Sequence, residues 1–335
     1  MTSQRLEELL DAAGNCSIGI IGDFCVDIYW NADMTKSELS RETPHYPLPV
    51  VAERCYPGAA GNTAANLAAL RPGNVLAISI IGDDWRGMLL ESELKNRGIS
   101  SENMILCPGR FTNAYCKPVR KGISATEYED PRLDFANYVP IDEGTENEII
   151  SRLEKIAKKV SVLCVSDQFE FGAVTPRVAE KISALAAEGL TVIVDSRYKI
   201  GAYKNVILKP NEIECWRAVY GNDGFLSATQ EQFIEAAGLL SKNNNSGVML
   251  TLGERGSAFV RDGNVTLVPP KLVSGDVDIC GAGDTFLSAF SCMLAAGASE
   301  TEAAQVASLA SAVTVHKIGV TGTANPGEIL EMLDR

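Results

Sequence analysis

The strongest constraint on the fold is an alternation of short apolar runs with amphipathic helical patterns. The apolar runs end in Asp or Gly and span residues 17–23, 75–84, 160–167, 190–195 and 247–253. Helical periodicity fills residues 62–71, 174–189 and 229–243 between them. Runs that are apolar at nearly every position are typical of strands buried on both faces, and their alternation with helices indicates a parallel sheet covered by helices. We therefore expect an α/β fold whose ligands bind outside the carboxyl ends of the strands.

Two segments depart from this alternation. Residues 24–57 are rich in proline and polar residues, and residues 107–138 contain short alternating stretches. Connections of this length are uncommon unless they are functional or disordered. The pattern favours additional strands that form a small β-lid, with a pair of long surface loops as the alternative. The rest of the chain is expected to form one large domain, so that residues 1–335 are a single unit that carries a lid.

Composition excludes several classes of protein. The formal net charge of −13 and the pI near 4.8 argue against a nucleic-acid-binding face, which needs a basic patch. No apolar run approaches the ~20 residues that span a membrane. The nine cysteines include no CxxC pair and lie mostly among apolar residues, which predicts a reducing, cytoplasmic location. With two histidines, a His-rich zinc site and an HExxH metalloprotease are excluded.

The stretch "DICGAGDTFLSAF" (residues 278–290) carries the sharpest chemical signal. Its apolar residues recur every three or four positions, so the turn formed by Gly281, Ala282 and Gly283 lies where a helix begins. The first N–H groups of a helix have no intrahelical partner and attract anions, and small residues let a phosphate approach them closely. Asp284 would repel that anion unless it has separate work, such as accepting a proton from an attacking hydroxyl. The alternative is a tight turn with an acidic residue that favours the helix start.

Three further clusters of small and polar residues follow strands. Residues 56–66, "YPGAAGNTAAN", enter a helix with Gly58 and Asn62 at its start. The stretch "KPNEIE" (residues 209–214) places Asn211 and Glu214 three positions apart, and "TLGERGS" (residues 251–257) contains Thr251, Gly253 and Gly256 in a strand–turn–strand pattern. A helix cap, a capping box and a hairpin are the structural alternatives. The chain has neither the GxxxxGK[ST] loop nor a GxGxxG fingerprint after the first strand.

These motifs, in this order, resemble those of the ribokinase-like, or PfkB-type, carbohydrate kinases over residues 19–327. "DICGAGDTF" is similar to the carboxy-terminal signature of that family, with Cys280 where threonine is usual. "PGAAGNTAAN" is similar to its amino-terminal signature, with Ala59 in place of a second glycine, and "NEIE" matches its NxxE motif. Within the family, "GDFCVDIYW", "SRETPHYPLPVV" and "RLDF" resemble the kinase domain of bacterial heptose-phosphate kinases. The HxGH motif of the nucleotidyltransferase domain that often accompanies that kinase domain is absent, so no second activity is expected.

The resemblance implies a ribokinase-like three-layer fold and an ATP- and Mg²⁺-dependent kinase that phosphorylates a hydroxyl of a sugar or sugar phosphate. In such a kinase Asp284 is the base, and the N–H groups of Ala282 and Gly283 in the Gly281 turn stabilise charge on the transferred phosphoryl group. Glu214 acts through Mg²⁺ and its water. The nucleotide contacts are Asn211, Thr251, Gly253 and Gly256. Asp195 and Arg197 either approach the nucleotide phosphates or form an ion pair that holds their loop.

On the acceptor side, Asp23 and Asp27 follow the first strand, and Gly58 and Asn62 belong to the glycine turn. Carboxylates and amides suit a sugar because each can bind two adjacent hydroxyls. Lys117 and Arg132 in the lid segments are candidates for a phosphate on the substrate, with solvated surface cations as the alternative. The expected partners are a sugar, ATP and a second copy of the chain bound through the lid.

Two other functions stay open. A nucleoside kinase of the same fold needs an aromatic wall for a base, for which Tyr29, Trp30 and Phe111 are available. A sugar-binding regulator without turnover would not need both Asp284 and the glycine turn.

Overall fold

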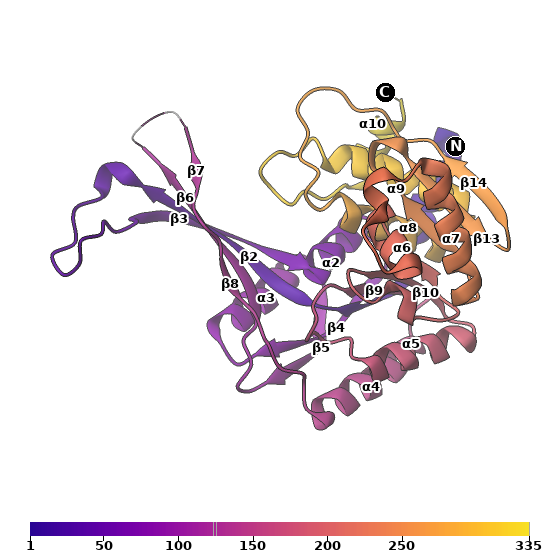
Figure 1. Cartoon of the computed structure of the whole chain (residues 1–335), viewed down its shortest axis with the longest axis horizontal. Coiled ribbons are helices and arrows are strands. Elements are labelled where there is room, and N and C mark those ends of the chain that lie inside the picture. The colour runs from indigo at the N-terminus through magenta and orange to yellow at the C-terminus, as the bar shows by residue number, and fades with distance from the viewer. Residues whose placement is uncertain (123, 125, 335) are drawn as a thin grey trace.

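The computed structural model describes residues 1–122, 124 and 126–334 and contains two sheets (Figure 1). The main sheet has nine strands in the order β14-β13-β12-β11-β10-β9-β1-β4-β5, parallel from β12 to β5 and antiparallel at β13 and β14. Its strands are β1 (Ser17–Gly22), β4 (Asn74–Gly82), β5 (Ser100–Cys107), β9 (Val162–Asp167), β10 (Thr191–Ser196), β11 (Ile207–Leu208), β12 (Val248–Thr251), β13 (Ser257–Arg261) and β14 (Asn264–Val268). The predicted parallel sheet is confirmed, because each predicted apolar run overlaps one of these strands.

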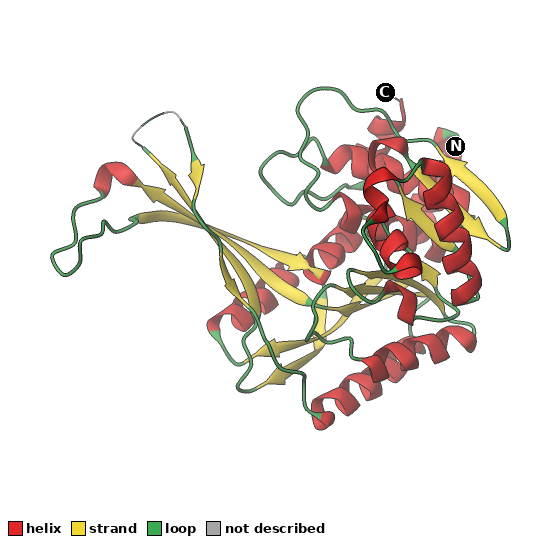
Figure 2. Ribbon diagram, viewed as in Figure 1, coloured by secondary structure: helices red, strands yellow, loops and turns green. Residues whose placement is uncertain are grey.

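Helices cover both faces of this sheet and give three layers (Figure 2). The helices are α1 (Ser3–Ala13), α2 (Ala60–Ala69), α3 (Trp85–Asn96), α4 (Glu143–Ala157), α5 (Pro176–Ala187), α6 (Glu212–Tyr220), α7 (Gln230–Asn244), α8 (Ala282–Ala295), α9 (Glu300–Thr314) and α10 (Pro326–Asp334). One buried cluster joins α1, α2, α8, α9 and α10 to one face of the sheet, and a second joins α4, α5, α6 and α7 to the other. Successive residues such as Ile20 and Ile21 enter different clusters, which explains why the strands are apolar without alternation.

The lid is the second sheet, which stands off the main body on one side (Figure 1). Its strands are β2 (Phe24–Asp33), β3 (Val50–Ala59), β6 (Asn113–Lys121), β7 (Tyr128–Glu129) and β8 (Leu133–Phe135). Val26, Ile28, Ala114 and Cys116 are buried on one of its faces, within the same cluster as α3. The predicted β-lid is thus confirmed, although residues 123 and 125 of the predicted segment 107–138 lie outside the described residues.

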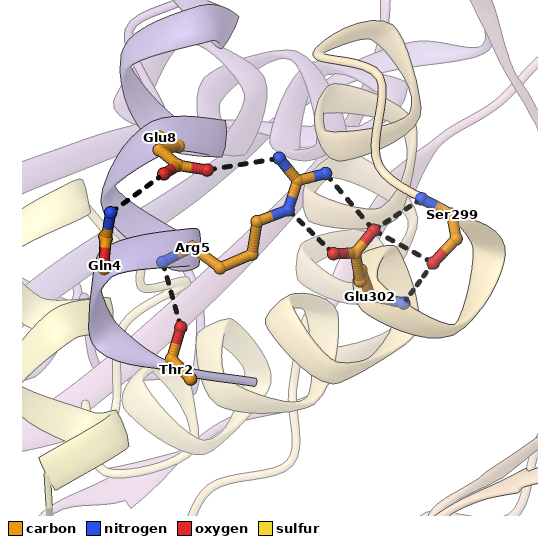
Figure 3. Close-up of polar contacts among 6 residues, drawn as sticks. All are labelled: Thr2, Gln4, Arg5, Glu8, Ser299 and Glu302. Atoms are coloured by element: carbon orange, nitrogen blue, oxygen red, sulfur yellow. Dashed lines mark hydrogen bonds and ion pairs between the residues drawn. The ribbon is translucent and has the colours of Figure 1, made fainter.

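Besides its buried apolar face, the amino-terminal helix contacts α9 through an ion pair (Figure 3). Arg5 of α1 donates from Nε to Oε1 of Glu302 at 2.8 Å, and Glu302 also closes the capping box of α9 with Ser299. The Arg5 hydrogen bond holds the pKa of Glu302 low, at about 2. In the part of the chain that the structure describes, no helix has the length and apolar character needed to cross a lipid bilayer.

Candidate active site

The glycine turn at the start of α8 is where the motif predicted it. Gly281 has φ +78, and a Cβ there would lie 2.9 Å from the Nδ2 atom of Asn62, so the turn needs glycine for both backbone and space. The backbone N–H of Ala282 donates a hydrogen bond to the Ile279 carbonyl oxygen, with an N···O distance of 3.2 Å. Gly283 is exposed on the first turn of the helix. This geometry leaves the helix start open to an anion.

Asp284 is held by the second glycine motif, 222 positions away in sequence. Asn62 donates from Nδ2 to Asp284 Oδ2 at 2.7 Å, and Thr63 donates from its hydroxyl to Oδ1 at 3.1 Å. Asn66 in turn donates to the Oδ1 atom of Asn62. Burial raises the pKa of Asp284 to about 6, and the nearby Asp195 carboxylate adds to this, while the bonds from Asn62 and Thr63 act in the opposite direction. The result is an oriented carboxylate whose pKa suits a general base.

The turn that supplies Asn62 is strained at Ala59. This residue caps α2 with φ +50 and ψ −124, a conformation that glycine adopts freely and alanine does not. It is the position at which the motif departs from the second glycine of the family pattern. Gly58, one residue earlier, has no room for a side chain, because a Cβ would lie 2.5 Å from Oδ2 of Asp27.

Asp27 lies on the face of the lid opposite the face that α3 covers. The strand register places Tyr56 of β3 and Tyr115 of β6 on either side of it. Lys117 forms an ion pair with Asp27 at 3.0 Å and donates to the Tyr29 hydroxyl at 2.9 Å. Burial disfavours the charged form of Lys117, but Asp27 and Tyr29 hold its pKa above the ordinary value. The structure thus brings Gly58, Asp27 and Lys117 together next to the turn that holds Asp284.

Two predicted acceptor contacts are occupied by other partners. Asp23 is buried and accepts hydrogen bonds from the backbone N–H groups of Gln168, Phe169 and Ala173, at 2.7 to 2.8 Å. This carboxylate therefore fixes the loop after β9, and its geometry does not support a sugar-binding role. Arg132 is paired with Asp134 through two hydrogen bonds, of 2.6 and 2.7 Å. It also lies over the Tyr115 ring, 4.1 Å from its centroid.

The NEIE motif forms the capping box that was its structural alternative. Asn211 accepts from the Glu214 N–H, and the Oε2 atom of Glu214 accepts from the Asn211 N–H at 2.9 Å. The Oε1 atom of Glu214 is not used by this box. Burial raises the pKa of Glu214 above its ordinary value, and the negative charge of Asp195 makes a second, smaller contribution in the same direction. The capping box and a ligand role are thus compatible, because the box fixes the side chain and leaves one carboxylate oxygen.

Sequence reasoning missed Lys209, which is buried and forms an ion pair with Asp195 at 2.8 Å. The Asp195 partner is thus Lys209 and not Arg197, so the predicted ion pair within the loop is wrong. A Cβ on Gly283 would lie 3.9 Å from the Lys209 ammonium nitrogen. A cation between Glu214 and the glycine turn is well placed for a phosphate. The only sequence feature that pointed to Lys209 was its position directly before "PNEIE". Its burial and its pairing with Asp195 could not be predicted from the residue type.

The remaining predicted nucleotide contacts lie beside this motif. Thr251 pairs with Asn211 in an isolated parallel bridge and donates its N–H to the Pro210 carbonyl at 3.0 Å. Gly253 has φ +58 with open space around it, and Gly256 has φ +87 with the Val268 carbonyl 2.3 Å from where a Cβ would be. The strand–turn–strand prediction is confirmed by β12 and β13. These residues lie at the carboxyl end of β12 and in the turn that leads to β13.

Comparisons with known proteins show the family of the chain. Residues 21–326 match the pfkB family carbohydrate kinase, so the chain belongs to this family. It is 32% identical over 338 residues to the bifunctional protein HldE of Geotalea uraniireducens, and 32% identical over 336 residues to that of Hyphomonas neptunium. Each alignment covers 98% of this chain, and the chain spans about 65% of the length of these relatives.

Solved structures share the fold at lower identity. Arabidopsis thaliana ribokinase, complexed with ribose and ATP, is similar with a TM-score of 0.69 and 20% identity over 96% of this chain and 99% of its own. Escherichia coli phosphofructokinase-2, in complex with fructose-6-phosphate, is similar with a TM-score of 0.70 and 19% identity. The match covers 95% of this chain and 98% of the phosphofructokinase chain. The predicted ribokinase-like fold and the predicted class, a carbohydrate kinase that acts on sugar hydroxyls, are both confirmed.

The hydrogen bonds of Asp23 predict a structural effect of its substitution. Asp23→Asn replaces one accepting oxygen with an N–H donor that faces a backbone N–H, so we expect the free energy of unfolding to fall by about 2–3 kcal/mol in urea titrations. The acceptor KM should change little. A variant with unchanged stability and a raised acceptor KM would instead return Asp23 to the sugar site.

Proposed function

We propose that this carbohydrate kinase transfers the γ-phosphoryl group of ATP to a hydroxyl of a sugar or sugar phosphate, with Asp284 as the general base. The observation that carries the proposal is the position of Asp284. Its carboxylate is oriented by Asn62 and Thr63, has a pKa raised to about 6, and follows directly on a glycine turn at a helix start. A base and an anion-binding helix start on one turn are what in-line transfer to a hydroxyl needs.

The reaction then proceeds with few covalent demands on the protein. Asp284 accepts the proton of the acceptor hydroxyl as that oxygen bonds to the γ-phosphorus, and the bond from phosphorus to the oxygen of the leaving ADP breaks. The Gly283 N–H donates to the developing charge on the phosphoryl oxygens, and the Lys209 ammonium neutralises part of it. The Ala282 N–H would add a second donor once it leaves the Ile279 carbonyl. Asp27, between Tyr56 and Tyr115, holds hydroxyls of the sugar.

The residues near Lys209 fit a Mg²⁺–nucleotide complex. An ion of this kind binds mainly through phosphates and water and needs few protein ligands. The free Oε1 atom of Glu214 would hold a water of this ion. When bound, Mg²⁺ neutralises phosphate charge. Asn211, Thr251, Gly253 and Gly256 would contact the nucleotide, and Gly253 allows close approach because it has no side chain and open space around it.

The alternative functions have less support. In a nucleoside kinase Tyr29, Trp30 and Phe111 would form a wall for the base, but neighbouring strand positions put Tyr29 and Trp30 on opposite faces of β2. Trp30 donates to Glu53, and Phe111 packs on Phe135. A regulator without turnover has no use for a base held this way.

The proposal extends to the organisation of the protein. Residues 1–335 would act as one kinase domain, and a homodimer would form through the lid, which exposes the apolar side chains of Tyr46, Val50, Val51 and Tyr128. The nine cysteines are all free, which supports a reducing, cytoplasmic location.

Removal of the base tests the mechanism. Asp284→Asn keeps the shape and the Thr63 contact, but cannot accept the hydroxyl proton, so we expect turnover to fall by about 10²–10⁴. ATP affinity, measured by calorimetry, should change little. Retention of a third or more of the wild-type turnover would reduce Asp284 to a helix-start residue.

Glu214 has a matched control in the same motif. Glu214→Gln should raise the Mg²⁺ concentration that gives half-maximal turnover, because a neutral amide binds magnesium water less strongly. Glu212→Gln alters a carboxylate that pairs with Arg255 at 3.0 Å and should leave the Mg²⁺ titration unchanged. Equal titrations for wild type and Glu214→Gln would reduce Glu214 to a capping residue.

A further inference from the structure

A cavity of about 970 Å³ opens after the carboxyl end of β10. Two of the residues that line it, Asn211 and Glu214, belong to the proposed nucleotide and Mg²⁺ contacts. Three cations, Arg197, Lys199 and Arg217, line it as well. A cavity of this volume can hold part of a small-molecule ligand. It shares a wall with the proposed nucleotide site, so its cations are candidates for contacts to the nucleotide phosphates.

Only one of these three cations has a free charge. Lys199 pairs with Asp167 at 3.4 Å, and Arg217 pairs with Asp223 at 2.9 Å. Arg197 is exposed, and among the described residues its guanidinium has no acidic partner within ion-pair distance. A guanidinium without a carboxylate partner suits a phosphate, because its planar fork can donate to two phosphate oxygens at once.

The register of β10 places Arg197 on the side of the sheet where the glycine turn lies. Its N–H donates to the Asp167 carbonyl at 3.0 Å, within the ladder that pairs Ser196 with Asp167. Successive side chains of a strand point to opposite faces, so Arg197 follows Asp195 on one face, while Ser196 bonds the Asp167 carboxylate on the other. Asp195 pairs with Lys209, the cation beside the glycine turn. Arg197 therefore extends β10 on the same face as this cation.

The strand order places the end of β10 between the nucleotide residues and the acceptor residues. In the sheet, β11 and β12 lie on one side of β10, and β9 and β1 lie on the other. Thr251 ends β12 and Asn211 follows β11, whereas Asp27 belongs to β2, the strand directly after β1. Helix α8, which carries Asp284, packs on β9 and β10. A nucleotide at β11 and β12 and an acceptor at β2 would therefore meet near the end of β10, and in-line transfer requires the γ-phosphate to lie between them.

We propose that Arg197 is a further catalytic residue, which binds oxygens of the γ-phosphate of ATP from the cavity after β10. The inference rests on the proposed kinase function and adds a residue to its site. Transfer spreads negative charge over the phosphoryl oxygens, and a fixed cation there stabilises that charge. ADP has no γ-phosphate, so Arg197 contacts ATP and loses this contact once the phosphoryl group has moved to the acceptor.

Nucleotide binding in the absence of an acceptor tests this assignment. The dissociation constants of Mg–ATP and Mg–ADP are measured by calorimetry for wild type, Arg197→Ala and Arg197→Lys. We expect the Kd for ATP to rise about ten- to a hundredfold in Arg197→Ala, which corresponds to the loss of one charge-assisted hydrogen bond, while the Kd for ADP stays unchanged. Arg197→Lys keeps the charge without the fork, so its Kd for ATP should lie between the other two.

Steady-state kinetics give a second readout. With an acceptor that the wild type phosphorylates, kcat of Arg197→Ala should fall about 10²- to 10³-fold at saturating substrates, because the loss of one donor to transition-state charge costs about that much. The KM for the acceptor should change little. A raised acceptor KM with unchanged kcat and unchanged ATP affinity would place Arg197 at the acceptor and overturn the assignment.

The matched control is Arg217→Ala, because Arg217 lines the same cavity and is already neutralised by Asp223. It should leave kcat and both nucleotide affinities unchanged. An equal effect in Arg217→Ala would overturn the assignment, since the loss would then follow from cavity charge in general. An equal loss of ATP and ADP affinity in Arg197→Ala would overturn it too, since the contact would then be to a phosphate that both nucleotides share.

The binding measurement separates this inference from the kinase proposal, because it needs no acceptor. If Arg197→Ala weakens the binding of ATP alone but the wild type phosphorylates no sugar or sugar phosphate, the γ-phosphate assignment holds and the kinase proposal fails. If the wild type phosphorylates an acceptor and Arg197→Ala binds both nucleotides as the wild type does, the assignment is wrong and the kinase proposal stands.

Discussion

The contact between Asn62 and Asp284 is the interaction on which the rest of the site depends. It joins the start of α2, which follows the lid strand β3, to the start of α8, which follows the glycine turn. Gly281 must lack a side chain because Asn62 occupies the space next to it, and Ala59 is held in a strained conformation in the turn that leads to Asn62. Strain of about 1–3 kcal/mol at such a residue persists only where the surroundings fix it. This hydrogen bond thus orients the proposed base and acts against the increase of its pKa that burial causes.

The charges around this contact divide the site into neutralised and free cations. Lys117, Arg132 and Lys209 each have a carboxylate partner, at 3.0, 2.6 and 2.8 Å. Lys209 is buried with its partner, where an ion pair contributes little net stability compared with an apolar pair but fixes a unique geometry. Arg197 differs because, among the described residues, its guanidinium has no acidic partner, although its backbone N–H is bound by the Asp167 carbonyl. An unpaired cation attracts anions more strongly than a paired one.

The sequence predicted the architecture well and the side-chain partners poorly, for physical reasons. Runs such as residues 17–23 are apolar on both faces, so the apolar pattern identified the parallel strands β1, β4, β9, β10 and β12. The parallel strands β5 and β11 were not predicted. The glycine turn and Asp284 were predictable because positive φ and a helix start require those residues. Asp23 was assigned to the sugar because it follows a strand, but three backbone N–H groups that converge on it could not be read from its neighbours. The partners of Lys117, Arg132 and Lys209 depend on strand register and loop packing, which local pattern does not encode.

The pH dependence of kcat/KM in wild type and in Asn62→Ala tests the central claim most directly. Protonation removes the base, so wild-type activity should fall as the pH decreases through about 6, the raised pKa of Asp284. Asn62 stabilises the charged carboxylate, and its removal should therefore raise this pKa and move the acidic limb to higher pH. A shift in that direction would establish that Asn62 sets the acidity of the base. The account would be contradicted if kcat/KM decreased at the same acidic pH in both proteins. It would also be contradicted if kcat/KM of the wild type did not decrease near pH 6.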